Sequence, residues 1–420
     1  MKRFFLLFFL IANLFAADAT VEIIKRMEKL PTIGLLDSTN HSVDNDFKSR
    51  FFKMLVGDLK VSTHFNVIDS YYKDEGGSPN SYFFGQNPDL ILKYSLEESF
   101  SSEIIARVKL IQANSGETRF EKSYKVSQKE RYPFLAHRII VELNDSLGHP
   151  SISWMERFII FSKYTNPKES EIVIGDYTLT FTKTIIKGGL NIFPKWADNE
   201  QEGFYYSDYN QRFPTIYYVN LSSGKKEKII HSEGMMIVSD VSKDSKKLLL
   251  TMAPKDQPDV FLYDVSTRKV EQVTRYGGID VGATFVDDES GIVFVSDRLG
   301  YPNIFTQKIG TQAVTQMVYH GKNNNSVTSY DRYMVYSSRE KASEFGAGTF
   351  NLYLISTKTD FIRQLTATGK NLFPRFSNDG ESILFIKEFG SQSALGIIRL
   401  GANKSYHFPL KAGHIQSIDW

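Results

Sequence analysis

FPRFSNDGESILFI, at residues 373–386, is the stretch that decides the fold. It combines a short apolar strand, a polar turn and a second apolar strand, and a third strand and a charged fourth follow it. The plan recurs through the C-terminal two-thirds of the chain at intervals of 44 to 47 residues. Its key positions are Trp196, Val241, Phe285, Phe376 and Trp420, with a weaker copy near Ser329. A period of about 40–45 residues with four strands per unit is typical of β-propeller blades.

The two ends of this repeat array complete each other. We name the strands of a unit A to D in chain order, with A strands expected near 193–196, 237–241, 281–285, 327–330 and 374–376. The unit at 157–186 lacks an A strand, whereas the last residues, 415–420, lack a B strand after them. We therefore expect residues 151–420 to form a six-bladed β-propeller closed by the C-terminal strand, because closure removes the open sheet edge.

The first 17 residues have the pattern of a signal peptide. Lys2 and Arg3 precede a 12-residue apolar run at 4–15, and small residues such as Ala16 and Ala17 follow. This run is shorter than the about 20 residues that a membrane-spanning helix needs; an uncleaved interfacial anchor is the alternative. The chain contains no cysteine, which excludes disulfides and thiolate metal sites. The pattern predicts export, with the periplasm as the compartment.

Residues 31–150 have a different pattern and predict an α/β domain with two helices on a mixed sheet. Phe47, Phe51, Leu55 and Leu59 recur at four-residue intervals and indicate a helix over 46–63, capped by residue 45 or 46. A second helix is expected over 133–147, and strands over 31–36, 64–69, 90–96, 104–112 and 118–126. The Gly- and Pro-containing stretch 71–88 suggests a mobile loop. A hinge at 148–150 leads into the propeller.

Charge and motifs restrict the function. The chain has 50 basic and 48 acidic residues, and removal of Lys2 and Arg3 with the signal peptide makes the two numbers equal. A balanced surface charge does not favour nucleic-acid binding. The chain has no Gly-x-Ser-x-Gly elbow, and its eight histidines are scattered. The Asn-Asp-Gly stretch at 378–380 and its equivalents predict hairpin turns.

We expect neither enzymatic activity nor a cofactor. The sequence leaves open whether a divalent cation binds in the propeller channel. The alternative is a periplasmic propeller enzyme, a metal-dependent lyase or a glycan-active protein, in which His231 and His320 between blades would contribute metal ligands.

Two surfaces are then candidates for partner binding. The D–A and B–C connections open on the same side of a propeller, which we call the loop face. They are rich in aromatic, Met and Arg residues, which are enriched at interfaces. Candidate contact residues on this face are Phe193, Met235, Arg298, Tyr301 and Phe373.

The second candidate surface is the mature N-terminal segment, residues 18–30. Its stretch DATVEIIKRME, at 18–28, alternates apolar and polar residues, and its candidate contact residues are Asp18, Val21, Ile23 and Ile24. Such a segment can add as a strand to the sheet edge of a partner. A simple first strand of the α/β sheet is the alternative.

Four strings carry a resemblance to a known family: NIFPKW (191–196), SDRLGYPNI (296–304), QLT (364–366) and PRFSNDG (374–380). They resemble the blade motifs of the TolB family, the periplasmic component of the Tol–Pal system of Gram-negative bacteria. The resemblance covers essentially the whole chain. Asp198, Lys243 and Asn378 replace the proline of the family's turn motif, which alters turn chemistry only.

This resemblance implies a non-enzymatic adaptor. It implies binding of the peptidoglycan-associated lipoprotein Pal on the propeller face and of TolA through the mature N-terminus, with other outer-membrane proteins as further partners. The implied roles are outer-membrane integrity, constriction during cell division and protein transport. The contact residues of the family lie in variable loops, so only loop positions carry over.

Overall fold

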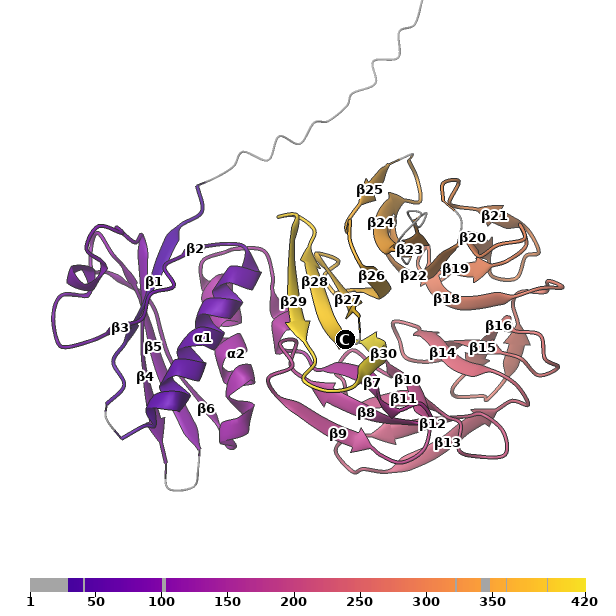
Figure 1. Ribbon diagram of the computed structural model, residues 1–420, viewed down its shortest axis with the longest axis horizontal. Coiled ribbons are helices and arrows are strands. Elements are labelled where there is room, and N and C mark those ends of the chain that lie inside the picture. Colours follow the sequence, from indigo (N-terminus) through magenta and orange to yellow (C-terminus); the bar gives the residue numbers. More distant parts are fainter. Residues whose placement is uncertain are drawn as a thin grey trace, which may run out of the picture. The chain divides into compact units, whose positions relative to one another are not determined.

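The computed structural model describes residues 29–40, 42–99, 103–321, 323–340, 348–359, 361–390 and 392–420. The predicted signal peptide and the segment 18–28, with Asp18, Val21, Ile23 and Ile24, lie outside the described residues. Residues 31–420 form one compact unit. Within it, a sheet covered by helices precedes a series of all-strand sheets (Figure 1).

A mixed sheet of six strands forms the N-terminal part of the described chain. Its strands are β1 (Thr32–Asp37), β2 (Asn66–Val67), β3 (Tyr72–Lys73), β4 (Leu90–Glu98), β5 (Ile104–Gln112) and β6 (Thr118–Val126). Their order is β2-β1-β4-β5-β6, and β3 also pairs with β1. β1 is parallel to β2, β3 and β4, whereas β4, β5 and β6 are antiparallel. The sheet is therefore mixed, as the sequence predicted.

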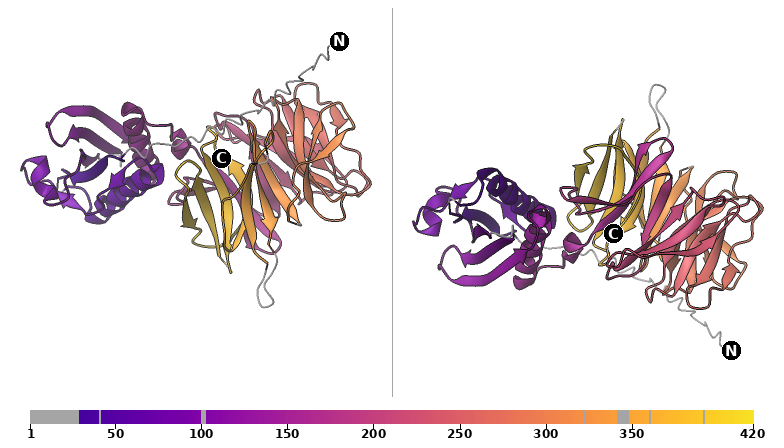
Figure 2. Two further views of the ribbon diagram at one scale, coloured as in Figure 1. Left: turned by 90° about the horizontal axis from the view of Figure 1, so that it is seen from above. Right: turned by 90° about the horizontal axis from the view of Figure 1, so that it is seen from below.

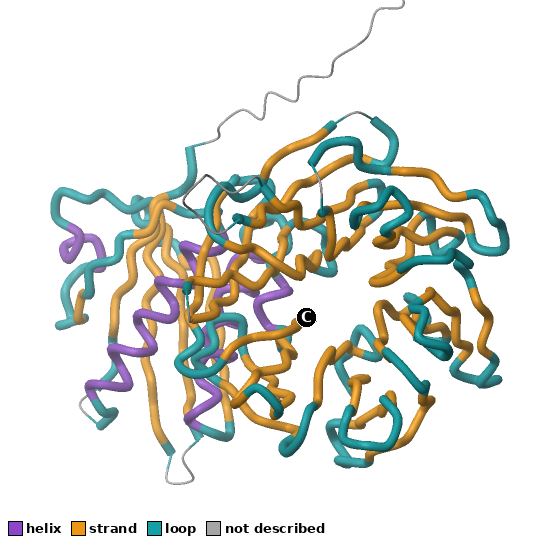
Figure 3. Tube along the Cα trace, turned by 45° about the vertical axis from the view of Figure 1, so that its right-hand side comes forward, coloured by secondary structure: helices purple, strands orange, loops and turns teal. Residues whose placement is uncertain are grey.

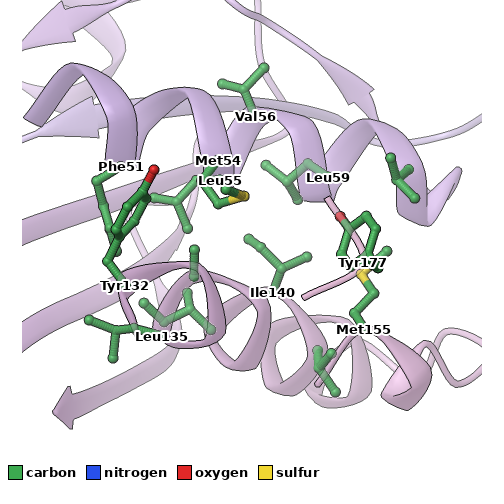
Figure 4. Packing of buried hydrophobic residues seen from close by; sticks show 14 of the residues in the cluster. Phe51, Met54, Leu55, Val56, Leu59, Tyr132, Leu135, Ile140, Met155 and Tyr177 are labelled. Atoms are coloured by element: carbon green, nitrogen blue, oxygen red, sulfur yellow. The ribbon is translucent and has the colours of Figure 1, made fainter. Parts of the chain in front are cut away.

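Two helices, α1 (Asn45–Ser62) and α2 (Tyr132–Ser146), lie beside this sheet. The regular elements described after residue 156 are all strands (Figure 3). The predicted apolar face of α1, Phe47, Phe51, Leu55 and Leu59, is completely buried. Figure 4 shows Phe51, Leu55 and Leu59 of this face directed toward α2. Two 3-10 helices, η2 (Lys129–Arg131) and η3 (Ser153–Glu156), flank α2.

The N-cap of α1 differs from the prediction. It is Asp44, whose carboxylate accepts a hydrogen bond from the Phe47 backbone nitrogen at 2.9 Å. The sequence had suggested Asn45 or Asp46. All three residues are good caps, and only the backbone geometry decides between them.

The stretch 71–88, which the sequence predicted to be a mobile loop, contains short regular elements and internal contacts. It contains β3 and the 3-10 helix η1 (Pro79–Phe83). The Phe83 ring is 2% exposed and lies over Gly34, where a Cβ atom would overlap it. The Tyr82 hydroxyl accepts hydrogen bonds from the backbone nitrogens of Glu75 (2.7 Å) and Gly77 (2.9 Å).

Three antiparallel sheets of four strands follow the predicted repeat, and we call each such group a blade. The first contains β10 (Asn191–Trp196), β11 (Gly203–Asp208), β12 (Thr215–Asn220) and β13 (Lys226–His231). The second contains β14 (Met236–Val241), β15 (Lys247–Met252), β16 (Asp259–Asp264) and β17 (Val270–Gln272). The third contains β18 (Asp280–Val286), β19 (Gly291–Ser296), β20 (Asn303–Lys308) and β21 (Val314–Gln316).

Two further groups of four are joined into an eight-stranded sheet, because Phe350 of β24 pairs with Lys370 of β26. One group contains β22 (Asn324–Tyr330), β23 (Tyr333–Arg339), β24 (Phe350–Ser356) and β25 (Ile362–Gln364). The other contains β26 (Lys370–Phe376), β27 (Ser382–Phe389), β28 (Gln392–Arg399) and β29 (Lys404–Pro409). The last sheet has the order β30-β7-β8-β9, with β30 (His414–Asp419), β7 (Ile159–Asn166), β8 (Glu169–Gly175) and β9 (Thr182–Ile186).

The C-terminal strand β30 contacts neighbours on three sides. It pairs with β7 in antiparallel fashion, with Ile418 opposite Phe161. Asp419 accepts a hydrogen bond from the Trp196 backbone nitrogen at 2.9 Å, and Trp420 donates its indole N–H to the Phe376 carbonyl at 2.7 Å. Consecutive A strands contact each other in the order β30, β10, β14, β18, β22 and β26, and β26 in turn contacts β30. Figure 2 shows these sheets from two further directions.

The A–B connections are short turns with the chemistry that the sequence predicted. Gly380 has φ +73°, Ser245 +61° and Asp287 +50°. Asp379 braces its turn by accepting a hydrogen bond from the Glu381 backbone nitrogen at 3.0 Å. These acidic residues are therefore turn residues. We call the propeller side that carries the A–B and C–D turns the turn face.

Candidate functional site

The A strands line the propeller channel, and each of them contains a register shift against its B strand. At four of these shifts the backbone is left-handed, with φ +52° at Phe193, +63° at Gly282, +53° at Ser326 and +50° at Phe373. Such bulges redirect side chains locally. Phe193 lies within β10, as the sequence predicted, whereas Phe373 lies within β26 and not in the loop before the predicted strand.

Hydroxyl groups of one blade fix the A strand of the next. Ser207 donates to the Met236 carbonyl at 2.7 Å, and Ser337 donates to the Asn371 carbonyl at 2.8 Å. The Ser417 hydroxyl of β30 accepts from the Phe193 backbone nitrogen at 3.1 Å. Buried backbone groups at the irregular positions therefore have partners across the blade boundaries.

A network of charges joins neighbouring A strands. Lys195 Nζ lies 3.4 Å from Asp240 Oδ1 and 3.0 Å from Asp419 Oδ1, and Arg375 Nε lies 3.7 Å from that same Asp419 oxygen. Asp240 Oδ2 also accepts a hydrogen bond from the Thr284 hydroxyl at 2.8 Å. Partly buried ion pairs contribute little net stability but hold the groups that they join in one arrangement. This network therefore fixes neighbouring blades relative to each other.

Sequence analysis missed this network, although the repeat contained its signal. A polar residue stands directly before each of the five key apolar positions, namely Lys195, Asp240, Thr284, Arg375 and Asp419, and Ser329 before Tyr330 is its counterpart in the weaker copy. Because side chains alternate along a strand, this position faces away from its apolar neighbour. Reading the repeat one residue earlier would have marked these six residues as a set.

A hollow of about 870 Å³ opens at the turn face. Charged side chains of both signs line it, among them Arg157, Lys195, Asp240, Arg375 and Asp419. Burial lowers the pKa of Arg157, and the nearby Asp419 opposes that shift. Because the wall carries both positive and negative side chains, it suits polar ligands and does not select for the sign of their charge.

Both faces expose large apolar side chains, and those at the turn-face connections are Val270 (38%), Tyr330 (39%), Phe361 (45%) and Ile362 (48%). Five large side chains on the loop face are well exposed: Met235 (41%), Leu299 (43%), Ile279 (45%), Phe389 (49%) and Tyr319 (80%). A smaller hollow of about 310 Å³ opens on this face, and its wall contains Leu372, Phe373, Ile386 and Ile415 together with Tyr164, Glu388, His414 and Gln416. Exposed apolar residues on a face with a partly apolar hollow are typical of protein-binding surfaces.

The predicted loop-face residues differ in their surroundings. Met235 lies in a D–A connection and is exposed, whereas Phe373 lines the smaller hollow. Tyr301 is half-buried in the B–C connection that also contains Arg298 and Leu299. Met235, Phe373 and the pair Arg298 and Tyr301 belong to three different blades.

Arg298 has a structural role of its own. Its Nη2 atom lies 3.0 and 3.1 Å from the two carboxylate oxygens of Asp280, which is completely buried. The guanidinium carbon also lies 5.0 Å from the ring centroid of Tyr276 and 4.9 Å from that of Phe305. Leu299, which is exposed, is therefore the better probe of partner binding on this loop.

The two histidines considered as metal ligands lie in separate surroundings. His231 ends β13 and stacks on Phe213, with ring centroids 6.0 Å apart. The Tyr336 hydroxyl lies 3.0 Å from His320 Nε2, and burial lowers the pKa of His320. Within the described ranges, no three His, Cys, Asp or Glu side chains are grouped so that they could hold a metal ion. None of the described helices combines the length and apolarity that a membrane crossing requires.

Comparison with known proteins identifies the family. A model described as the TolB beta propeller domain matches residues 147–420. The Tol-Pal system protein TolB of Wolinella succinogenes is 50% identical over 419 residues, which cover 98% of this chain and 98% of that protein. The TolB protein of Helicobacter hepaticus is 44% identical over 418 residues, covering 99% of this chain and 98% of that one.

The fold also resembles that of a solved structure. The crystal structure of TolB from Acinetobacter baumannii superposes with a TM-score of 0.74 at 19% identity, covering 93% of this chain and 97% of that chain. At this identity the likeness concerns the fold alone. From the full-length sequence relatives and the matching propeller model, we conclude that the chain belongs to the TolB family of the Tol–Pal system.

Proposed function

We propose that this chain is a non-enzymatic periplasmic adaptor of the Tol–Pal system. It binds the lipoprotein Pal through the loop face and TolA through the mature N-terminal segment, and supports outer-membrane integrity and constriction during division. One observation carries the Pal assignment: the loop face combines five well-exposed large apolar side chains with a partly apolar hollow. The wall of the larger turn-face hollow is rich in charge instead.

The adaptor requires a rigid platform, and we propose that six blades closed by β30 provide it. Support comes from the pairing of β30 with β7 and from the bonds of Asp419 and Trp420 to the two neighbouring A strands. A closed ring places loops from different blades on one surface. Partner binding can then use several loops without reorganising the strands.

A matched pair of variants tests the face that binds Pal. Phe389 on the loop face and Phe361 on the turn face are 49% and 45% exposed, so replacing either by alanine removes a similar surface. We expect Phe389→Ala to weaken binding of the purified Pal domain by about 2 kcal/mol, or about 30-fold in Kd. Phe361→Ala should bind Pal like the wild type. The opposite pattern in calorimetric titrations would assign Pal to the turn face.

The TolA assignment rests on the segment that contains Asp18, Val21, Ile23 and Ile24. Removing residues 18–25 should abolish capture of the TolA C-terminal domain, while Pal binding and the melting temperature stay as in the wild type. The main-chain edge and the alternating apolar side chains would both be lost to the partner. A large fall in melting temperature with TolA capture retained would instead make this segment a core strand.

The absence of enzymatic activity is also part of the proposal. Purified protein should give background rates with hydrolase and lyase substrate panels. Turnover that is abolished by substitution of His231 or His320 would favour the propeller lyase. Tightly bound Mn²⁺ or Zn²⁺ in the purified protein would favour the same alternative.

A further inference from the structure

Four side chains form a buried polar cluster where the α/β domain meets the propeller. Asp58 comes from α1, His137 from α2, and Asp176 and Tyr177 from the turn after β8. Each of these residues is completely buried. We call this set the interdomain cluster. Figure 4 shows Tyr177 on the side of the helix pair where Leu59 and Met155 lie.

The cluster is a continuous chain of hydrogen bonds. The Tyr177 hydroxyl donates to Asp58 Oδ1 at 2.5 Å, and His137 Nδ1 lies 2.8 Å from Asp58 Oδ2. On its other side, His137 Nε2 lies 3.4 Å from Asp176 Oδ2. Asp176 is fixed in turn, because its Oδ1 atom accepts from the Phe181 backbone nitrogen at 2.6 Å. Polar atoms of two helices are thus tied to one propeller turn.

The geometry favours a protonated imidazole. Both ring nitrogens of His137 face carboxylate oxygens, and only the protonated ring can donate from both nitrogens. A neutral ring would present a lone pair to one of the two buried carboxylates. A buried charge without a partner is costly, so the interface as built favours the proton.

Of the two carboxyl groups beside the ring, Asp176 supports this charged state, whereas the burial of Asp58 opposes it. Burial by itself lowers the pKa of His137, but the charges of Asp58 and Asp176 outweigh it and raise the pKa to about 9. Burial raises the pKa of Asp58, and the bonds to His137 keep that of Asp176 below its ordinary value. Burial also raises the pKa of Tyr177 and of Tyr406 from β29, so neither phenol adds a charge near neutral pH.

We propose that the proton on His137 acts as a latch that holds the α/β domain in one orientation on the propeller. While the ring is protonated, α1 and α2 are tied to the 176–181 turn. Loss of the proton leaves a carboxylate without a donor and loosens the contact. Two other bonds cross the same interface, Tyr406 to the Lys60 carbonyl at 2.6 Å and Arg399 to the Ser62 carbonyl at 3.5 Å. They keep the domains associated, so the expected change is in orientation and mobility.

The sign of the pH dependence follows from the raised pKa. A histidine that holds its proton more tightly in the folded state stabilises that state fully below its unfolded pKa of about 6.5. This contribution disappears as the pH rises through about 9. The latch is therefore closed at neutral and mildly acidic pH and opens under alkaline conditions. It requires no partner protein and stands or falls independently of Pal and TolA binding.

Distance measurements between the domains test the latch. The natural chain has no cysteine, so Ser115→Cys and Lys225→Cys, at exposed positions in the two domains, give unique sites for spin labels. Pulsed electron paramagnetic resonance should give one narrow distance distribution at pH 6 and 7 and a broad one at pH 9.5. His137→Gln should give the broad distribution at every pH. His407→Gln, an exposed histidine outside the cluster, should behave like the wild type.

Two outcomes would overturn the latch. A distribution that is the same from pH 6 to 9.5 in the wild type would remove the pH dependence. If His137→Gln does not fold, the ring signals of His137 in NMR spectra of the unaltered protein decide the question. They should report a protonated ring at pH 7.5, and a neutral ring at that pH contradicts the proposal.

Discussion

Replacing Ile418 by alanine tests whether β30 holds the propeller together. The Ile418 side chain is 1% exposed and lies opposite Phe161 of β7 in the cluster of buried residues that includes both ends of the propeller. Truncating a buried isoleucine to alanine costs about 2–5 kcal/mol. A domain's whole stability is about 5–15 kcal/mol. At about 2–4 °C per kcal/mol for a unit of this size, the melting midpoint should fall by about 4–20 °C.

Thermal unfolding followed by circular dichroism measures this change. Ile279→Ala is the matched control, because Ile279 is 45% exposed on the loop face and its truncation should change stability by less than about 0.5 kcal/mol. Removal of residues 414–420 should lower the midpoint further, since Ile415, which is 3% exposed, is lost as well. If Ile418→Ala and Ile279→Ala have the same melting midpoint, β30 does not close the propeller.

Three further predictions concern other buried contacts. Arg298→Ala leaves the completely buried Asp280 without its charge partner and should cost about 3–5 kcal/mol in denaturant unfolding, whereas an unchanged midpoint would make Arg298 a free surface residue. Gly34→Ala places a Cβ atom in the Phe83 ring and should cost about 1–3 kcal/mol; a neutral effect would mean that the η1 turn is not anchored there. Unfolding free energy should decline between pH 6.5 and about 9 in the wild type and less steeply in His137→Gln, and equal slopes would contradict the charged state of His137.

Local sequence patterns predicted the elements well. β5 and β6 have the predicted bounds, and the four apolar residues of α1 form its buried face. Periods of 2 and 3.6 residues are local signals, so one sequence suffices to detect them. The turn residues around Asp379 follow the same logic, since backbone conformation and residue type are coupled within a few positions.

Contacts between distant segments could not be predicted in the same way. Lys195 and Asp419 are 224 residues apart, and their pairing depends on how the first and last A strands meet. The bulges at Phe193 and Phe373 depend on the B strands opposite them. The sequence suggested Arg298 as a surface contact because arginine is enriched at interfaces. In the structure it binds Asp280, which lies in the A strand of the same blade.

The interdomain cluster is the clearest case of this limit. Asp58, His137 and Asp176 come from three separate elements, and no spacing in the sequence relates them. His137 stands on the predicted second helix as one of eight scattered histidines. Only the packing of that helix against α1 and the 176–181 turn gives the residue its charge.

Hydrogen–deuterium exchange with and without the purified Pal domain tests the central claim most directly, because it reports both propeller faces at once. Protection on binding should fall on the loop face, at residues 232–236, 276–280, 297–302 and 388–390, which include Met235 and Leu299. The turn-face segments 197–202, 242–246, 287–290 and 377–381 should exchange as in the free protein. Protection confined to those turns, with unchanged exchange on the loop face, would contradict the proposed site.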